Sequence, residues 1–343
     1  MKAWVIERIV NIGEDSSPLK QIELPVPEPN EKQILIQVES CGVCHTEIDE
    51  IEGRAAPPLL PMIPGHQVVG KVVERGKESR RFQRGERVGV AWIFEACGEC
   101  DYCLRGEENL CPNFRASGRD AHGGYAEYMV VNENFAYPIP EELSAFEAAP
   151  LLCAGAIGYR SLRLSNLENR MRLGLAGFGA SAHLVLMMVK AMYPNREVYV
   201  FSRSEGEREF AKQLGAVWAG AIEERSPQKL DAIIDTTPAW KPVLEALRNL
   251  AAGGRLVINA IRKEDYDRNL LAELDYPAQL WMEKEIKSVA NVTRLDVEAC
   301  LRLAAEKNIR PEFQIYQFEE ANRAILDLKN RKIKGAKVLQ VAS

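Results

Sequence analysis

A few side chains near the start of the chain can bind a metal and move a proton. Cys44 and Thr46 lie in the segment 39–49, and His66 follows a Pro-Gly pair. A cysteine thiolate and an imidazole are zinc ligands, and a hydroxyl both donates and accepts a proton. Cys41 and Cys44 also form a Cys-x-x-Cys pair, which occurs at redox-active and at inert positions, so these residues alone leave the metal assignment open.

Four further cysteines lie close together in the pattern Cys-x2-Cys-x2-Cys-x7-Cys. They are Cys97, Cys100, Cys103 and Cys111. Gly98 and Gly106 allow the tight turns that a chain needs to wrap four thiolates around one tetrahedral zinc. Because such a shell leaves no open position for a substrate, the spacing predicts a structural zinc site. An iron-sulfur cluster is the alternative, although the gaps differ from both common ferredoxin patterns.

A glycine-rich turn follows a predicted strand at 172–176 and opens a predicted helix at 182–192. The turn consists of Gly177, Phe178, Gly179, Ala180, Ser181 and Ala182. Gly177 allows a tight turn, Gly179 lets the backbone approach a pyrophosphate, and Ala182 takes the third position of the Gly-x-Gly-x-x-Gly/Ala pattern. The free amides at the start of the helix favour an anion. This context predicts a dinucleotide site.

The end of the next predicted strand, 197–201, bears on the choice of cofactor. NAD sites usually have Asp or Glu there to bind the ribose hydroxyls, but this chain continues with Ser202 and Arg203. A hydroxyl and a guanidinium suit the additional phosphate of NADP. The sequence therefore favours NADP, with NAD as the alternative if Arg203 is only a solvated charge at the end of a strand.

Two kinds of secondary structure position these residues. Residues 1 to about 150 are rich in strand patterns, at 33–38, 67–73 and 87–92, separated by proline-rich connections. From Arg172 strands and helices alternate, which predicts a parallel doubly wound sheet. The later strands are expected at 232–235, 254–259 and 286–290, and the second helix at 207–214. A helix at 297–306 and a strand at 336–341 are expected to return to the first domain.

The composition excludes several classes of protein. The chain has 343 residues, of which 46% are hydrophobic and 27% charged, so it is expected to be globular with two domains. A net charge of −5 and the lack of a long basic run argue against a nucleic-acid partner. The first ten residues are interpreted as a strand rather than a signal peptide, and no membrane span is expected, so cytoplasm is the expected location. The eight cysteines are then better explained by metal or catalysis than by disulfides.

These motifs, in this order, resemble those of the zinc-dependent alcohol dehydrogenases of the medium-chain dehydrogenase/reductase superfamily. The resemblance covers nearly the whole chain and includes the segment Ala-Pro-Leu-Leu-Cys153-Ala-Gly. It implies a GroES-like, β-rich catalytic domain at 1–153 with 292–343, and a Rossmann domain with a parallel sheet at 154–291. It also implies a catalytic zinc held by Cys44, His66 and Cys153, in addition to the structural zinc.

The resemblance further implies roles around that zinc. Thr46 would relay the proton of the alcohol. Asp49 stands where many relatives have a relay histidine, and His45 stands where relatives have a basic residue against the pyrophosphate; a neutral, solvated His45 is equally compatible. Gln67 replaces the glutamate that most relatives have after the zinc-binding histidine, which we expect to alter zinc exchange rather than abolish activity.

Three further residues are candidates for packing roles rather than chemical ones. Trp92 matches a position that walls the alcohol pocket in relatives, where it would favour aliphatic or aromatic alcohols over polyols, although a tryptophan on a strand is often a core residue. Cys41 is expected to pack near the site without binding metal. Cys300 is expected to be a small buried apolar residue.

The leading hypothesis is an NAD(P)-dependent alcohol dehydrogenase that interconverts primary or secondary alcohols with aldehydes or ketones and forms a homodimer or homotetramer, as relatives do. One alternative is a zinc-independent reductase of activated alkenes or quinones, against which Cys44, His66 and Cys153 argue. The other is a protein that keeps the zinc and nucleotide sites but has lost catalysis, which only Gln67 and Asp49 favour.

Overall fold

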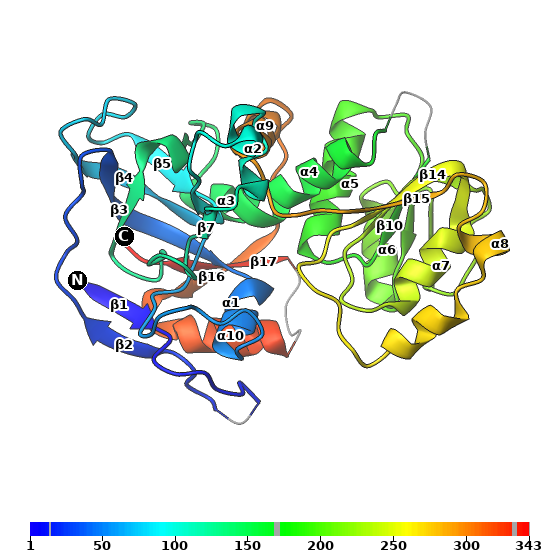
Figure 1. Ribbon diagram of the computed structural model, residues 1–343, viewed down its shortest axis with the longest axis horizontal. Helices are drawn as coiled ribbons and strands as arrows, with labels where there is room; N and C mark the ends of the chain where they lie inside the picture. The colour runs from blue at the N-terminus through cyan, green and yellow to red at the C-terminus, as the bar shows by residue number, and fades with distance from the viewer. Residues whose placement is uncertain (14, 168–171, 331–334, 343) are drawn as a thin grey trace. The chain divides into compact units, whose positions relative to one another are not determined.

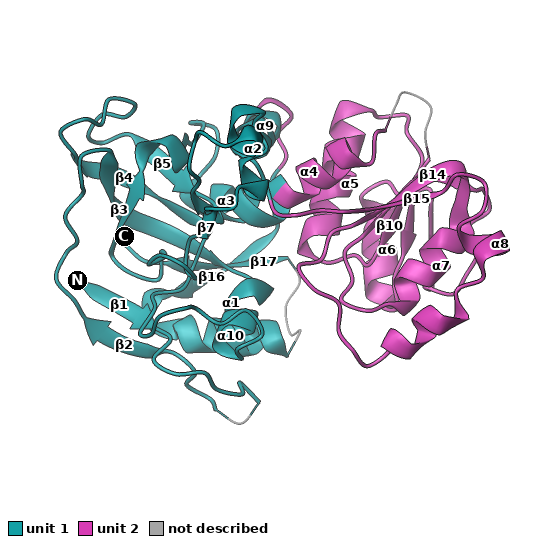
Figure 2. Cartoon of the chain, in the orientation of Figure 1, with its two compact units in different colours: residues 1–156, 292–305, 310–343 teal, residues 157–291, 306–309 magenta. Residues whose placement is uncertain are grey.

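The computed structural model describes residues 1–13, 15–167, 172–330 and 335–342, which divide into two compact units (Figure 1 and Figure 2). Unit 1 comprises Met1–Ala156, Val292–Ala305 and Arg310–Ser343, and unit 2 comprises Ile157–Asn291 and Glu306–Ile309. The sequence placed the borders after residues 153 and 291. The assignment of a catalytic role to unit 1 and a cofactor role to unit 2 stays a prediction.

A seven-stranded sheet forms the framework of unit 1. Six strands run in the order β16-β17-β3-β4-β5-β9, and β8 pairs with β3. Their bounds are β3 (Gln33–Val43), β4 (Val68–Arg75), β5 (Arg87–Val90), β8 (Tyr128–Asn132), β9 (Ala136–Pro138), β16 (Phe313–Gln317) and β17 (Ala336–Gln340). In β3 the alternate side chains of Ile34, Ile36 and Val38 are fully buried, as the period of a strand requires. The strands predicted at 33–38, 67–73 and 336–341 are confirmed.

Shorter elements complete unit 1. Two antiparallel pairs are β1 (Lys2–Val5) with β2 (Lys20–Glu23), and β6 (Ile93–Glu95) with β7 (Arg115–Ala116). The helices are α1 (His45–Ile51), α2 (Asp101–Leu104), α3 (Ala145–Pro150), α9 (Arg294–Glu306) and α10 (Ala321–Lys329), with a π-helical turn η3 (Leu151–Gly155) and 3₁₀ turns η1 (Glu108–Leu110), η2 (Glu133–Phe135) and η5 (Phe318–Glu320). The strand expected in the first ten residues is therefore present as β1.

Unit 2 contains a parallel sheet of six strands in the order β12-β11-β10-β13-β14-β15. The strands are β10 (Leu173–Ala176), β11 (Val198–Phe201), β12 (Trp218–Gly220), β13 (Leu230–Asp235), β14 (Leu250–Ile258) and β15 (Glu285–Ser288). The helices are α4 (Ala156–Leu164), α5 (Ala180–Met192), α6 (Glu205–Gln213), α7 (Lys241–Asn249) and α8 (Tyr276–Gln279), with the 3₁₀ turn η4 (Arg268–Glu273). Every residue of β10 and β11 is buried, which is typical of a sheet covered on both faces.

The strand order of this sheet reverses between β10 and β13. From β10 the chain moves outward through β11 to β12, and it then returns to β13 on the other side of β10. Because parallel crossovers are right-handed, α5 and α7 cover opposite faces of the sheet. Ligands of doubly wound folds bind beyond the carboxyl ends of the strands at such a reversal, which is where the turn between β10 and α5 lies. The predicted doubly wound sheet is confirmed.

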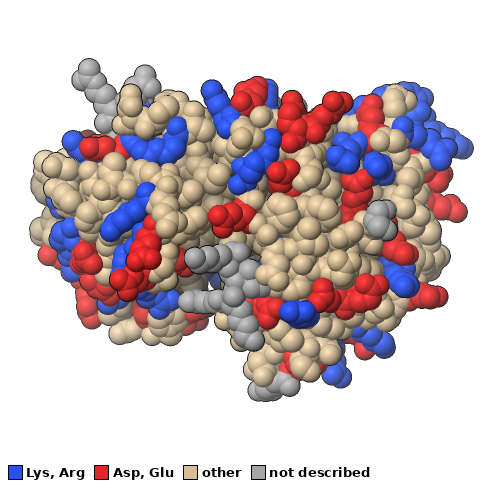
Figure 3. Space-filling model, turned by 180° about the vertical axis from the view of Figure 1, so that it is seen from behind, with Lys and Arg blue, Asp and Glu red and all other residues tan. Residues whose placement is uncertain are grey.

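Charge is mixed on the surface. Figure 3 shows acidic and basic side chains interspersed over the face that it displays, rather than gathered by sign. Within the part of the chain that the structure describes, no helix combines the length and the apolar character that a membrane crossing needs.

Candidate active site

Three segments that are far apart in the sequence bring the predicted ligands Cys44, His66 and Cys153 together in unit 1. Their candidate ligand atoms all lie within 4.8 Å of one another. The Sγ of Cys44 lies 3.6 Å from the Nε2 of His66. Zn–S and Zn–N bonds of roughly 2.3 and 2.1 Å at a tetrahedral angle separate such atoms by about 3.6 Å, so these residues fit a zinc ion.

Neighbouring elements fix these three side chains. Cys44 directly follows β3 and caps α1, where its Sγ accepts a hydrogen bond from the backbone N–H of Thr46 at 3.3 Å. His66 lies two residues before β4, the antiparallel partner of β3, and its side chain is only 1% exposed. Cys153 lies in η3, and π-helical turns of this kind often occur at functional sites. Three ligands leave a fourth tetrahedral position open, which is typical of catalytic zinc.

A buried carboxylate lies beside the Nδ1 of His66, the ring nitrogen that faces away from Cys44. The Oε1 of Glu47, a residue with a fully buried side chain, lies 2.7 Å from the Nδ1 of His66. The Oε2 of Glu47 accepts a hydrogen bond of 2.8 Å from the backbone N–H of Cys44. A carboxylate beside Nδ1 favours the proton on that nitrogen and leaves Nε2 for a metal.

The pKa values of the site follow from burial and from this carboxylate. The Cys153 thiol and burial raise the pKa of Cys44 well above its usual range. Burial lowers the pKa of His66, but its electrostatic and hydrogen-bond interactions with Glu47 and Cys44 outweigh burial and raise that pKa well above the usual value. A bound metal cation would oppose the shift at Cys44 and favour its thiolate, because metal charge deprotonates a coordinating thiol.

The predicted relay residues lie on α1. Thr46 is nearly fully buried and is the second residue of α1, two positions after Cys44. Asp49 accepts a hydrogen bond of 2.5 Å from the Nε of Arg54, so one of its oxygens is engaged. His45 is exposed. The helix therefore places Thr46 next to the ligand group and leaves His45 toward solvent.

Trp92 and Gln67 also lie beside the ligands. Trp92 follows the end of β5, and its ring meets that of His66 edge-on with centroids 5.0 Å apart. Gln67 is buried and lies against Gly42, where a Cβ would approach its Oε1 to 2.6 Å. Trp92 thus borders the site, whereas the Gln67 side chain lies over the neighbouring strand.

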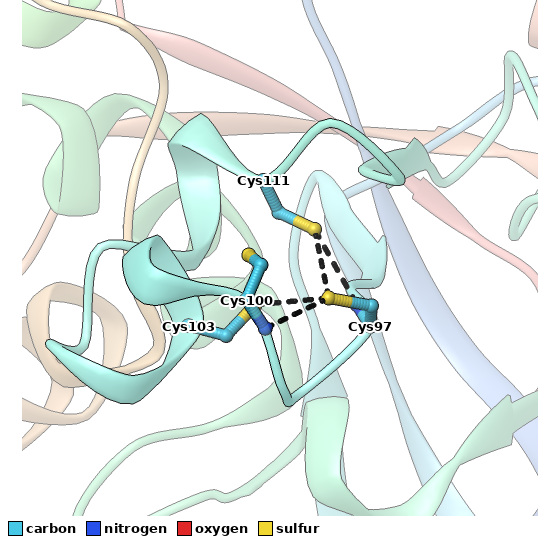
Figure 4. A group of neighbouring side chains, drawn as sticks. All are labelled: Cys97, Cys100, Cys103 and Cys111. Atoms are coloured by element: carbon cyan, nitrogen blue, oxygen red, sulfur yellow. Dashed lines mark hydrogen bonds between the residues drawn. The ribbon is translucent and has the colours of Figure 1, made fainter.

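The four-cysteine lobe gathers all its sulfur atoms within 4.8 Å of one another (Figure 4). The Sγ of Cys97 lies 3.5 Å from that of Cys111 and 3.9 Å from that of Cys103. A tetrahedral zinc with Zn–S bonds of roughly 2.3 Å separates its sulfur ligands by about 3.8 Å, so this group fits zinc as well. Gly98 and Gly106 have φ angles of +78° and +73°, as expected for tight turns.

Backbone N–H groups of the lobe donate hydrogen bonds to its sulfur atoms and so favour a thiolate at Cys97. The Sγ of Cys97 accepts a bond of 3.4 Å from the N–H of Cys100. Hydrogen bonds from the backbone of Glu99 and Cys100 lower the pKa of Cys97 to about 6. Burial raises the pKa of Cys103 to about 12. The lobe is also attached to α9, because the Nε of Arg294 donates to the buried Oε1 of Glu108 at 2.6 Å.

The glycine-rich turn of unit 2 has the geometry that a pyrophosphate site needs. Gly177 has φ +80°, and a Cβ there would lie 2.9 Å from the Oγ1 of Thr236. Gly179 caps α5, and a Cβ there would enter open space. The start of α5 is thus accessible to a ligand, and its amides favour an anion. Phe178 and Ala182 are buried, and the Oγ of Ser181 accepts a bond of 3.3 Å from Asn259.

Ser202 and Arg203 follow β11, beside this turn. The N–H of Gly177 donates to the carbonyl oxygen of Phe201 at 2.8 Å, which joins the turn to the end of β11. Ser202 is buried, and its hydroxyl donates to Glu207 of α6, whereas Arg203 is exposed.

Comparison with known proteins gives the family. Residues 30–141 match the family described as "Alcohol dehydrogenase GroES-like domain". The chain is 41% identical to the probable alcohol dehydrogenase AdhA of Mycobacterium tuberculosis, over 99% of this chain and 97% of the relative. It is 33% identical to an alcohol dehydrogenase of Geobacillus stearothermophilus, over 97% and 98% of the two chains. The structure of a cinnamyl alcohol dehydrogenase from Sorghum bicolor matches with TM-score 0.85 and 26% identity, over 99% and 97%.

The chain belongs to the zinc-type medium-chain alcohol dehydrogenases. Within this alcohol dehydrogenase the structure assembles both predicted cysteine groups, and two cysteines lie outside them. Cys41 is buried in β3, and Cys300 is buried in α9, where burial raises its pKa to about 12.

Sequence reasoning missed two carboxylates of this alcohol dehydrogenase. Glu47 supports His66, and Glu207 binds Ser202. A signal for Glu47 was present, because an acid three residues after a helix-capping residue commonly returns to the cap. Glu207 carries a weaker signal, since it stands in the first turn of a predicted helix but belongs to no nucleotide-binding pattern.

Proposed function

We propose that this alcohol dehydrogenase reversibly oxidises a primary or secondary alcohol to an aldehyde or ketone, with a nicotinamide dinucleotide as the hydride acceptor. The observation that carries the proposal is the grouping of Cys44, His66 and Cys153 within 4.8 Å, with an open fourth position. Zinc held there by Cys44, His66 and Cys153 would lower the pKa of a coordinating hydroxyl toward neutrality. The reaction gives a carbonyl compound, the reduced cofactor and one proton.

The residues of the chain orient the reactants and move the proton. Thr46 is buried beside Cys44 and accepts the hydroxyl proton of the alcohol. Asp49 or water carries the proton onward, and the ion pair of Asp49 with Arg54 makes Asp49 the weaker route. Glu47 keeps the His66 imidazole in the orientation that a ligand needs.

Two further features support details of the proposal. Trp92 packs against His66 and offers an apolar wall, which favours aliphatic or aromatic alcohols over polyols. The similarity to a cinnamyl alcohol dehydrogenase is compatible with an aromatic substrate. The four-cysteine lobe would hold a second, structural zinc, so that each chain carries about two zinc ions.

The glycine-rich turn from Gly177 to Ala182 supports nicotinamide dinucleotide binding by unit 2. Arg203 supports NADP, since its exposed guanidinium follows β11 where a ribose phosphate would lie. NAD remains the alternative cofactor.

The test is the initial rate with a panel of alcohols and aldehydes, using NAD(H) and NADP(H) in parallel, before and after treatment with a zinc chelator. Turnover that the chelator removes and added zinc restores would support the proposal. Turnover that is indifferent to chelation would favour a zinc-independent reductase. A zinc-replete protein that binds nucleotide without turnover would favour the non-catalytic alternative.

A further inference from the structure

A carboxylate occupies the place where the sequence suggested a phosphate site. At the end of β11 the hydroxyl of Ser202 donates its hydrogen bond to the Oε2 of Glu207. The same Oγ accepts a bond of 3.2 Å from the N–H of Ser204. Ser202 is 2% exposed, so its hydroxyl has little freedom to turn toward another partner.

The local fold holds Glu207 there. Ser204 caps α6, and its side chain accepts a bond of 3.3 Å from the N–H of Glu207. Glu207 therefore stands in the first turn, where a negative charge is stabilised by the helix dipole. Two amides at this helix start are already bonded, because the N–H of Ser204 donates to the Oγ of Ser202 and the N–H of Glu207 donates to the Oγ of Ser204.

The position matters for the adenosine ribose. The turn at Gly177 is bonded to Phe201, the residue before Ser202, so Ser202 and Glu207 lie beside the predicted pyrophosphate turn. In doubly wound folds, an acid at the end of this strand binds the ribose hydroxyls of NAD. Here the chain has no acid at the strand end, but α6 returns one to it.

We propose that Glu207 is a specificity-determining residue that opposes the 2′-phosphate of NADP and keeps NAD usable. The inference rests on the nucleotide binding proposed above. Its carboxylate competes with the phosphate for the Ser202 hydroxyl and repels the phosphate charge, whereas it can accept hydrogen bonds from the ribose hydroxyls of NAD.

Two arginines act in the opposite direction. Arg203 is exposed next to Ser202. Arg208 is held in place, because its Nη1 donates to the carbonyl oxygens of Ser202 and Arg203 at 2.8 and 3.1 Å. The cofactor preference is then the balance between these guanidinium groups and Glu207, and removal of the carboxylate charge shifts that balance toward NADP.

The experiment compares two nucleotides that differ only in the 2′-phosphate, 5′-AMP and adenosine 2′,5′-bisphosphate, by calorimetric titration of the zinc-loaded protein. Glu207→Gln keeps an oxygen that can accept from Ser202 and removes the charge. We expect the affinity for the bisphosphate relative to 5′-AMP to rise about tenfold, the change that corresponds to roughly 1.4 kcal/mol. Glu209→Gln, on an exposed residue of the same helix, is the matched control and should leave the ratio unchanged.

Arg203→Ala is a second variant, for which we expect the opposite change in the affinity ratio. It should lower the affinity for the bisphosphate and leave the affinity for 5′-AMP unaffected. An unchanged ratio in Glu207→Gln, with both nucleotides still bound, would overturn this inference alone. A failure of unaltered protein to bind either nucleotide, NAD or NADP would overturn the proposed function as well. The binding readout does not depend on turnover, so the two failures are distinguishable.

Discussion

The two cysteine groups of unit 1 are built in opposite ways. The four-cysteine lobe comes from a single segment, Cys97 to Cys111, in which two of the thiols are half-buried and backbone N–H groups face the sulfur atoms. The group of Cys44, His66 and Cys153 comes from three segments, and a buried carboxylate lies behind it. The lobe is therefore formed by one local segment, whereas the group of Cys44, His66 and Cys153 forms only when distant segments of unit 1 pack together.

This difference extends to the charge of the thiols. Backbone hydrogen bonds lower the pKa of Cys97 to about 6. The neighbouring thiol and burial raise the pKa of Cys44 well above its usual range. The backbone of the lobe therefore stabilises the thiolate of Cys97, whereas the thiolate of Cys44 would gain its stabilisation from a bound metal.

The largest expected effect is on activity, from Cys44→Ser. Serine preserves the cap of α1 but removes the thiolate ligand, so kcat should fall by about 10³-fold or more, in line with the several kcal/mol that a metal supplies. Zinc content by atomic spectroscopy should fall from about two to about one per chain. Cys300→Ser is the control, since that buried cysteine belongs to neither group. Full activity in Cys44→Ser would contradict the proposed ligand set.

The matching change in the lobe, Cys97→Ser, should affect stability instead. Loss of a structural metal removes folding free energy, and we expect the Tm to fall by about 10 °C. The kcat of the remaining folded enzyme should change by less than about fivefold, which corresponds to roughly 1 kcal/mol. Calorimetry and rate measurements on the same preparation check both parts. A loss of activity without a loss of stability would reverse the assignment of the two groups.

A smaller effect is expected from the carboxylate behind His66. Glu47→Gln removes the charge beside the Nδ1 of His66, so zinc should dissociate about 10-fold to 100-fold faster, as measured with a colorimetric chelator. Gln67→Glu is the comparison variant, and we expect a smaller change because Gln67 lies over Gly42. Equal effects of the two variants would argue against a special role for Glu47.

The smallest expected effect concerns the metal-free protein. At pH 7 the pKa of about 6 leaves Cys97 mostly as thiolate, whereas the raised pKa of Cys44 leaves it as thiol. Iodoacetamide should therefore modify Cys97 about 10-fold faster than Cys44, because the thiolate is the nucleophile. The rate at Cys97 should fall as the pH drops below about 6 and rise above it. Peptide mapping by mass spectrometry would detect the reverse order, which would contradict the charge comparison.

The lobe, the glycine-rich turn and the alternating strands could be predicted from the sequence because each depends on residues that are neighbours in the chain. Spacing alone gave the group from Cys97 to Cys111, and periodicity gave the parallel sheet of unit 2. For Cys153 spacing was insufficient, and the family resemblance supplied it, because its approach to Cys44 depends on the packing of η3.

What the sequence did not reveal are side chains that act across helical turns. Glu47 returns to His66 and to the cap of α1, and Glu207 returns to the end of β11. The position of Glu47, three residues after the cap, indicates a return to the cap but not to His66, and Glu207 belongs to no pattern that indicates Ser202 as its partner. The carboxylate of Glu47 reaches His66, and that of Glu207 reaches Ser202, only once α1 and α6 have formed beside the ends of their strands.

The pairing of β17 with β3 has a consequence for biosynthesis. β3 leads directly into Cys44, and its neighbour β17 is formed by residues 336–340, about three hundred positions later. On the ribosome, the contiguous segment Ile157–Asn291 of unit 2 emerges before β17 exists, so it is able to fold first, while the sheet beside Cys44 still has an unpaired edge. A nascent chain would therefore expose all four cysteines of the lobe to chaperones and to cellular zinc long before β17 pairs with β3, the strand that leads to Cys44.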